Sequence, residues 1–403
     1  MTKKSDAPAI RFKGFSDAWE QRKLGELCNI TTGKLDANAM VSDGQYDFYT
    51  SGIDVFKIDV AAFEGPAITI AGNGASVGYM HLADGKFNAY QRTYVLTDFL
   101  ADRQFLNVAI GNELPNKIQE EVRGSGIPYI VLNMLTDLAI PFPSHEEQYA
   151  IGVYFQQLDN LITLHQRKFE KLTNVKKSML EKMFPQNGSS YPEIRFKGFT
   201  DPWEQRKFGE VFDCTVPNNT LSRAELSYDE GTVLNVHYGD VLIKYGSVLD
   251  VQKDDIPRIP HRCIEDFNGA LLQDGDVIIA DTAEDETTGK ACEIGNLQGS
   301  TIVSGLHTMV CRPRNRMALG YLGYYLNSNA YHHQLLPLMQ GIKVLSLSRS
   351  NIQKTSVSYP SAMKEQQLIA SYFSQLDHLI TLHQRELEKL QNIKKSMLEK
   401  MFV

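Results

Sequence analysis

Several side chains have types and spacings that could support chemistry, but none of them completes a catalytic pattern. Asp281, Glu284, Asp285 and Glu286 form an acidic run that could hold a cation, although such runs are more often solvated loops. The segment 288–291, Thr-Gly-Lys-Ala, resembles the end of a phosphate-binding loop, yet it lacks both the upstream glycine and the hydroxyl residue that follows the lysine. We therefore expect no nucleotide site there.

Other familiar catalytic patterns are also incomplete. Gly72-Asn73-Gly74 followed by Gly78 is not a dinucleotide fingerprint, because no acidic-ended second strand or long amphipathic helix follows in register. His332 and His333 are adjacent, so on a helix they would point in different directions, and no His-Glu-x-x-His motif is present. The Asn/Asp-Pro-Pro-Tyr/Phe motif of amino-methyltransferases is absent. The sequence predicts no catalytic residue, no metal ligand and no cofactor bound by this chain.

Composition places the chain among folded cytoplasmic proteins. The five cysteines are scattered and never form a Cys-x-x-Cys pair, which is typical of a reducing compartment without a disulfide frame. No apolar run has the length of a signal peptide or of a membrane span, so we expect a cytoplasmic protein with no membrane partner. The net charge of −7 argues against nucleic-acid binding unless the fold clusters basic residues or a partner supplies them.

The elements that would have to position any functional side chain form an internal repeat. Residues 154–184 return at 372–402 with 25 identities over 31 positions, and residues 10–23 return at 194–207 with 12 identities over 14. The segments between these repeats, body 1 (24–143) and body 2 (208–360), show little similarity to each other. A constant frame with dissimilar inserts is the main clue to function. Identity of exposed as well as buried side chains favours two equivalent docking surfaces over an ordinary helical hairpin core, which would explain only the apolar stripe.

The repeated segment has the pattern of a long helix that packs against a second helix. Neither copy contains Gly or Pro, and apolar residues recur at heptad-like spacings. Ser144 with Glu147 reads as a capping box, so the first helix should begin near His145. The predicted packed stripe, in which the repeated histidines form a polar layer, comprises Leu158, Leu161, Ile162, His165, Phe169, Leu172 and Met179 in the first copy and Leu376, Leu379, Ile380, His383, Leu387, Leu390 and Met397 in the second.

Connectivity predicts how the two helices would pair. The first helix carries the chain from body 1 to body 2, so the second helix must run back antiparallel to pack along it. We therefore expect an α+β protein with a pseudo-twofold internal repeat, in which two mixed α/β bodies lie at opposite ends of an antiparallel two-helix coiled coil. The expected boundaries are 1–143 for the first domain with its N-terminal anchor, 144–184 for the first helix, 185–193 for a linker, 194–360 for the second domain with its anchor, and 361–403 for the second helix.

Both bodies read as short strands and turns with a few helices. The anchor segment 10–23 is expected to pack on the helix pair. In body 1 we expect strands at 67–71 and 94–96 and helices at 102–110 and 117–122. In body 2 we expect strands at 277–280 and 308–311 and one helix over 321–339.

The whole arrangement resembles the specificity subunit of type I restriction-modification systems. The features that carry the resemblance are the anchor–body–helix order repeated once, the Ile-Thr-Leu-His-Gln-Arg and Lys-Lys-Ser-Met-Leu-Glu-Lys-Met-Phe cores, and the Trp-Glu-x-x-Lys-[Leu/Phe]-Gly-Glu segments at 19–26 and 203–210. The resemblance implies that each body is a target recognition domain reading one half of a split, asymmetric site in double-stranded DNA. It also implies two modification (methyltransferase) subunits carrying S-adenosylmethionine, and restriction (motor and nuclease) subunits using ATP and Mg.

Base readout requires polar and basic side chains on loops that can face a groove. The residues we expect to contact DNA are Lys34, Asn73, Ser76, Tyr90, Gln91, Arg92, Arg123 and Ser125 in body 1, and Lys244, Tyr245, Lys290, His307, Lys343, Ser348 and Arg349 in body 2. Two other functions stay open at this point. One is a self-contained restriction enzyme or methyltransferase, and the other is a two-armed scaffold that binds protein or glycan without DNA.

Overall fold

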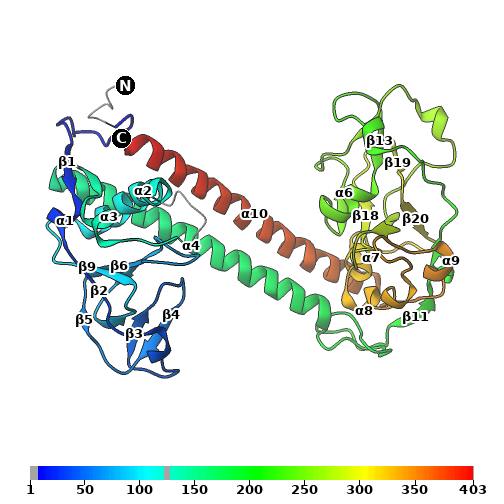
Figure 1. Cartoon of the computed structure of the whole chain (residues 1–403). Helices are drawn as coiled ribbons and strands as arrows, with labels where there is room; N and C mark the ends of the chain where they lie inside the picture. Colours follow the sequence, from blue (N-terminus) through cyan, green and yellow to red (C-terminus); the bar gives the residue numbers. More distant parts are fainter. Residues whose placement is uncertain (1–7, 122–127, 403) are drawn as a thin grey trace. The chain divides into compact units, whose positions relative to one another are not determined.

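The computed structural model describes residues 8–121 and 128–402 and divides the chain into two compact units. Unit 1 is Met1–Arg167 together with Gln384–Val403, and unit 2 is Lys168–His383. The boundary passes through both long helices, α4 (His145–Lys182) and α10 (Met363–Met401), so each unit contains one end of each helix (Figure 1). Strands and helices are mixed in both units, as the α+β prediction requires.

Unit 1 contains two four-stranded sheets, with strand orders β2-β9-β6-β7 and β4-β3-β8-β5. A small apolar cluster including Phe87 and Val95 separates the sheets, and α2 covers the other face of the first sheet through Phe105 and Ile110 (Figure 1). Its remaining elements are β1 (Glu20–Lys23), α1 (Leu24–Leu27), β2 (Asn29–Thr32), β3 (Tyr46–Tyr49), β4 (Val55–Ile58), β5 (Phe63–Glu64), β6 (Ala67–Ala71), β7 (Met80–Ala83), β8 (Lys86–Ala89), β9 (Thr93–Thr97), α2 (Arg103–Glu121), α3 (Leu132–Thr136) and β10 (Ala139–Phe142).

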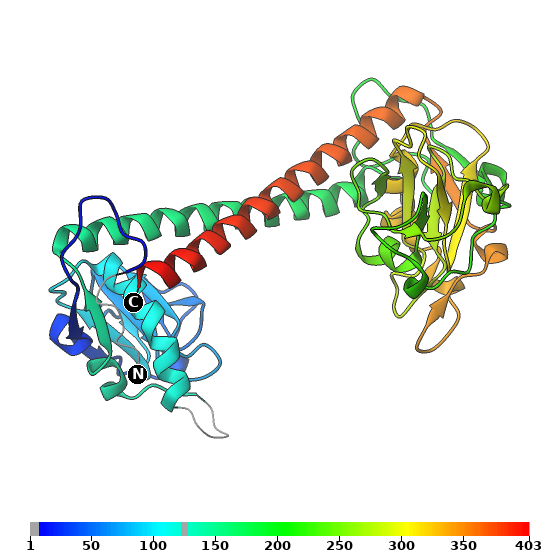
Figure 2. The same ribbon diagram turned by 90° about the horizontal axis from the view of Figure 1, so that it is seen from above.

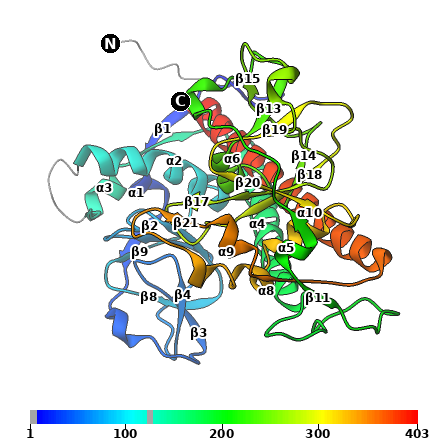
Figure 3. The ribbon, with the colours of Figure 1, turned by 90° about the vertical axis from the view of Figure 1, so that its right-hand side faces the viewer.

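The core of unit 2 is a five-stranded sheet of order β12-β20-β16-β18-β14, and a three-stranded sheet β15-β13-β19 lies beside it (Figure 3). The elements are β11 (Glu204–Lys207), α5 (Phe208–Val211), β12 (Phe212–Asp213), β13 (Val233–Val236), α6 (Tyr238–Ile243), β14 (Val248–Asp250), β15 (Arg258–Ile259), β16 (Val277–Ala280), β17 (Thr282–Ala283), β18 (Ala291–Gly295), β19 (Ile302–Ser304), β20 (Thr308–Pro313), α7 (Tyr321–Leu326), α8 (Asn329–His332), β21 (Leu345–Ser346), α9 (Arg349–Ile352) and β22 (Ser356–Tyr359).

The strand predictions are confirmed, and the helix predictions in both bodies need correction. Residues 67–71 form β6 and 277–280 form β16, because continuous apolar runs suit strands buried on both faces. The two helices expected at 102–110 and 117–122 are one helix, α2, which continues through Pro115. The single helix expected over 321–339 is broken into α7, α8 and a short 3-10 turn, with the breaks at Asn327 and after His332.

The repeated anchor segments pack as expected, each within its own unit. β1 pairs antiparallel with β10, and β11 pairs antiparallel with β22, so each anchor closes onto the last strand of its body just before the long helix begins. In unit 1 the backbone of Ile10 also donates to the carbonyl of Lys400, and Phe12 packs edge-on against Tyr154. Among the described residues, no helix is both apolar enough and long enough to cross a membrane.

The helix ends form the apolar centre of each unit. In unit 1, Phe155 and Leu158 of α4 belong to the same buried cluster as Met401 and Phe402. In unit 2, Met183 and Phe184 share a cluster with Phe373 and Leu376. Within each unit, residue numbers rise along one helix as they fall along the other, so the paired segments are antiparallel.

The predicted packed stripe is wrong at two positions. Leu161 is 44% exposed and its repeat equivalent, Leu379, is 40% exposed, and each shares a flank of its helix with another exposed leucine three residues on, Leu164 or Leu382. Leu158 and Leu376 are buried. The other predicted members are half-buried: Ile162, His165, Phe169, Leu172, Met179, Ile380, His383, Leu387, Leu390 and Met397.

Candidate nucleic-acid interface

Three loops of body 1 converge at one end of the sheet that contains β9 and β6. The amide of Gly33 donates to Thr93 O (3.1 Å), that of Gly72 donates to Arg92 O (2.9 Å), and that of Gln91 donates to Leu35 O (2.9 Å). A Cβ at Gly33 would lie 1.9 Å from the carbonyl oxygen of Ala89, so the first loop can approach only with glycine at this position.

This convergence gathers most of the residues predicted for body 1. Lys34, Gln91 and Arg92 are exposed on neighbouring loops, and Asn73, Ser76 and Tyr90 lie half-buried behind them. Among the described atoms, Asn73 Oδ1 is buried and has no hydrogen-bond partner, which is the state of an acceptor that a bound group or water would satisfy. The two remaining residues, Arg123 and Ser125, lie outside the described residues.

Three residues predicted for body 2 make contacts within unit 2, and of the three only Tyr245 is buried. Lys244 Nζ donates to Asp255 (2.8 Å) and lies 4.6 Å from the ring centre of Tyr228. Lys290 Nζ donates to the carbonyl of Leu242 (2.8 Å), and burial lowers the pKa of its ammonium group. Tyr245 is 3% exposed and belongs to an apolar cluster, so the expectation that its side chain faces a groove is wrong.

The other residues predicted for body 2 lie on one exposed patch. The amide of Asp281 donates to His307 O (3.0 Å), and the amide of Leu347 donates to Asp281 O (2.8 Å), which joins the loop of His307 to the segment that carries Lys343, Ser348 and Arg349. The side chains of all four predicted residues are exposed. We refer to this surface, defined by His307, Lys343, Ser348 and Arg349, as patch 2.

Sequence reasoning missed the polar contact that fixes each anchor. Glu147, which is fully buried, accepts two hydrogen bonds from Arg11 (2.6 and 2.7 Å) and one from Trp19 Nε1 (3.2 Å). The capping box is therefore only half formed. The amide of Glu147 donates to Ser144 Oγ (3.4 Å), but the Glu147 carboxylate binds the anchor residues Arg11 and Trp19 and does not bind the backbone of Ser144. In unit 2, Arg195 and Trp203 make the same contacts to Glu365 at 2.7, 2.9 and 3.3 Å.

The signal for these contacts was present in the repeat. Arg, Trp and Glu recur at equivalent positions in both copies, and the two tryptophans are the only ones in the chain. A second repeated ion pair joins the helices within each unit: Lys394 Nζ lies 2.5 Å from Asp159 in unit 1, and Lys176 Nζ lies 2.5 Å from Asp377 in unit 2.

Four leucines on the long helices remain exposed at equivalent positions of the repeat. Leu161 and Leu164 are 44% and 46% exposed, and Leu379 and Leu382 are 40% and 45% exposed. Two large apolar side chains on one flank of a helix, repeated in both copies, are typical of a surface that binds a protein partner.

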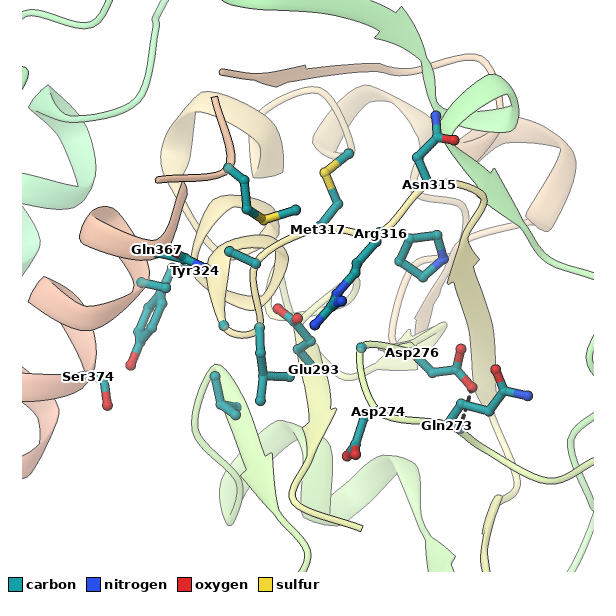
Figure 4. A pocket seen from close by; sticks show the side chains of 18 of the residues that line it. Gln273, Asp274, Asp276, Glu293, Asn315, Arg316, Met317, Tyr324, Gln367 and Ser374 are labelled. Atoms are coloured by element: carbon teal, nitrogen blue, oxygen red, sulfur yellow. Dashed lines mark hydrogen bonds between the residues drawn. The ribbon is translucent and has the colours of Figure 1, made fainter. Parts of the chain in front are cut away.

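Unit 2 also contains an open cavity of about 1080 Å³ between body 2 and the start of α10 (Figure 4). Arg312 makes a bidentate ion pair with Asp276 on one wall (2.8 and 2.7 Å). Glu293 accepts a hydrogen bond from the amide of Gly323 (2.9 Å), and burial raises the pKa of its carboxyl group to about 7. Within residues 8–121 and 128–402 no group of three or more His, Cys, Asp or Glu side chains is placed to hold a metal ion.

Residues 16–174 and 200–392 each match the family model described as type I restriction modification DNA specificity domain. The chain is 43% identical over 144 residues to the type I restriction enzyme EcoDI specificity subunit of Escherichia coli, covering 36% of this chain and 31% of that protein. It is 22% identical over 291 residues to the MjaVIII specificity subunit of Methanocaldococcus jannaschii, covering 70% of this chain and 65% of that protein. The chain thus spans less than two thirds of the length of either relative.

The fold is shared with a solved structure. The crystal structure of the type I restriction-modification system S subunit from M. genitalium superimposes with a TM-score of 0.63 at 18% identity, covering 98% of this chain and 99% of that one. At this identity the likeness shows the fold alone.

Proposed function

Since the chain belongs to the type I restriction-modification DNA specificity family, with two specificity domains, we propose that each body reads one half of a bipartite, asymmetric DNA site. The observation that carries this proposal is the contrast between one repeated frame and two dissimilar sets of exposed loop residues. Lys34, Gln91 and Arg92 gather in body 1, whereas patch 2 gathers in body 2. Different donor and acceptor sets select different bases, so the two half-sites should not be palindromic.

We place the catalytic work on partner subunits. Two methyltransferase subunits would dock on the repeated leucine surfaces, one on Leu161 with Leu164 and one on Leu379 with Leu382, and would bring S-adenosylmethionine to the adenine. Restriction subunits would add the ATP- and Mg-dependent motor and nuclease. The equivalence of the two leucine surfaces supports identical partners at both.

The charge balance supports a dependence of DNA binding on these partners. Acidic residues outnumber basic residues in both bodies, and phosphate neutralisation supplies much of the affinity in protein–DNA complexes. The chain alone should therefore bind its site weakly, and its complex with methyltransferase subunits should bind tightly at the same salt concentration. Equal affinities of the two species would contradict this part of the proposal.

We also propose that α4 and α10 set the gap between the two half-sites. Duplicating residues 172–178 in one helix and 390–396 in the other inserts one heptad into each and should change the tolerated gap while leaving both half-sites unchanged. A change in the recognised bases would show that the helices do more than set a spacing.

The decisive experiment is co-expression with a methyltransferase subunit encoded at the same locus, followed by genome-wide mapping of methylated adenine. We expect a single split motif with a fixed gap. A stable complex that leaves the genome unmethylated at any split motif would contradict the proposal and would favour a protein-binding scaffold.

A further inference from the structure

Part of patch 2 is a short hairpin, residues 340–346, which carries Lys343. The amide of Gln340 donates to Ser346 O (3.0 Å), the amide of Ser346 donates to Gln340 O (2.8 Å), and β21 pairs with β17 at its base (Figure 3). Gly341 has a φ of +127°, and a Cβ there would lie 1.8 Å from the carbonyl oxygen of Val344. The turn therefore requires glycine at this position.

The tip of this hairpin is apolar and almost completely in solvent. Ile342 is 99% exposed and Val344 is 51% exposed, with the exposed Lys343 between them. Figure 2 shows the segment, in orange, standing out from the sheet of unit 2. An isoleucine held in solvent does not stabilise the free protein by burial, which points to a contact that Ile342 makes on binding.

The position of the hairpin indicates which partner it meets. Asp281 links the loop of His307 to Leu347, one residue after β21, and the tip itself carries Lys343, so the hairpin is part of patch 2. The acidic residues 284–286 follow β17, which pairs with β21 at the base of the hairpin, whereas the tip carries the positive charge of Lys343. Phosphates would therefore attract the tip and repel the base. The major groove of B-DNA admits a two-stranded ribbon of this width.

We propose that Ile342 enters the major groove of the half-site read by body 2 and packs on the C5-methyl group of a thymine. This inference rests on the proposed function, because it assumes that body 2 reads DNA. The thymine methyl is the one apolar mark on the major-groove edge of the base pairs, so an isoleucine at a groove-facing tip selects for it. Lys343, beside it, reaches a phosphate or a guanine edge.

The test uses the complex of the full chain with its methyltransferase subunits and a duplex carrying the mapped site. Each thymine of the body 2 half-site is replaced in turn by uracil, which removes only the methyl group, and binding is measured for wild type and for Ile342→Ala. We expect one uracil substitution to weaken wild-type binding roughly four- to tenfold, as loss of a buried methyl contact requires. Ile342→Ala should lose the same factor on the thymine duplex and should not distinguish uracil from thymine.

Ile243→Ala is the matched control, because Ile243 is 88% exposed in the same unit but belongs to the end of α6 and not to the hairpin. It should bind both duplexes as wild type does. A half-site without thymine in either strand, or independent losses from uracil and from Ile342→Ala, would overturn the inference. So would loss of methyltransferase binding by Ile342→Ala. In each of these outcomes the mapped split motif still stands, whereas the absence of any motif contradicts the proposed function itself.

Discussion

In unit 1 the buried carboxylate of Glu147 holds Arg11 and Trp19, and in unit 2 that of Glu365 holds Arg195 and Trp203 with distances that agree within 0.2 Å. We call each set of a buried glutamate, an arginine and a tryptophan a joint. The bodies attached to the two joints have different sheets, strand orders and exposed loops. The joint and the helices thus form one repeated frame, and two different bodies fit the same frame without altering it.

One position on the helices shows how the frame adapts to each body. Gly152 of α4 lies where a Cβ would meet Asp102 Oδ1 at 2.7 Å and the amide nitrogen of Phe105 at 2.9 Å, so α2 can start directly against the helix. The equivalent residue in α10 is Ala370, which lines the open cavity of unit 2 instead. The equivalent helix surface is therefore covered by α2 in unit 1 and lines an open cavity in unit 2.

The largest expected effect is on the joints. Glu147→Ala and Glu365→Ala each leave a half-buried arginine without its partner and a buried tryptophan N–H without its acceptor, which should cost about 3 kcal/mol of stability. Because the two joints are equivalent, the two losses should agree within about 1 kcal/mol, as measured by urea unfolding of each variant.

The matched controls are Glu181→Ala and Glu399→Ala, which change exposed glutamates at equivalent positions of the same helices. They should change stability by less than about 0.5 kcal/mol. A large loss from only one joint variant would show that the two anchors are not equivalent.

The joints also show how far the sequence could predict the molecule. Helix period and repeat identity predicted α4, α10 and the packing of the anchors, because those signals are local or are duplicated. They did not predict that the Glu147 carboxylate would bind Arg11, because this contact depends on where a segment 136 residues away in the sequence packs. For the same reason, loop positions such as Lys244 and Lys290 could be chosen by residue type, but their internal partners, Asp255 and Leu242, could not be foreseen.

The second prediction concerns a group for which body 1 has no counterpart in sequence. Burial raises the pKa of Glu293 from 4.5 to about 7, so the folded protein holds this proton more tightly than the unfolded chain does. The stabilisation from this bound proton is fully present below pH 4.5 and is lost as the pH rises through about 7, above which no further loss occurs. The total loss is on the order of 3 kcal/mol. Glu293→Gln should flatten this slope, as measured by unfolding at pH 5 and pH 8, whereas the same change at Glu181 should leave it intact.

The third prediction tests whether the two leucine surfaces bind equal partners. Leu161→Lys with Leu164→Lys should remove one methyltransferase subunit from the complex, and Leu379→Lys with Leu382→Lys should remove the other, each by weakening a contact worth about 2 kcal/mol or more. Native mass spectrometry should show the partner stoichiometry fall from two to one for either pair and to zero for both. Thr163→Lys and Thr381→Lys place the same charge on exposed positions of another face and should retain two partners. Two partners retained by the leucine variants would contradict the docking surfaces.

The last prediction concerns a small difference in coupling energy between the two inter-helix ion pairs. Lys394 and Asp159 in unit 1 are partly exposed, so a double-mutant cycle to alanine should give a coupling of about 0.2–1 kcal/mol. In unit 2, Asp377 also accepts from the hydroxyl of Tyr324 (2.9 Å), and Lys176 Nζ lies 5.8 Å from the centre of that ring. The pair of unit 2 is thus held in a three-membered network, so its coupling should be larger by a few tenths of a kcal/mol and less sensitive to salt. If Tyr324→Phe leaves the Lys176–Asp377 coupling unchanged, the body does not reinforce the frame at this point, and the two units are equivalent here as well.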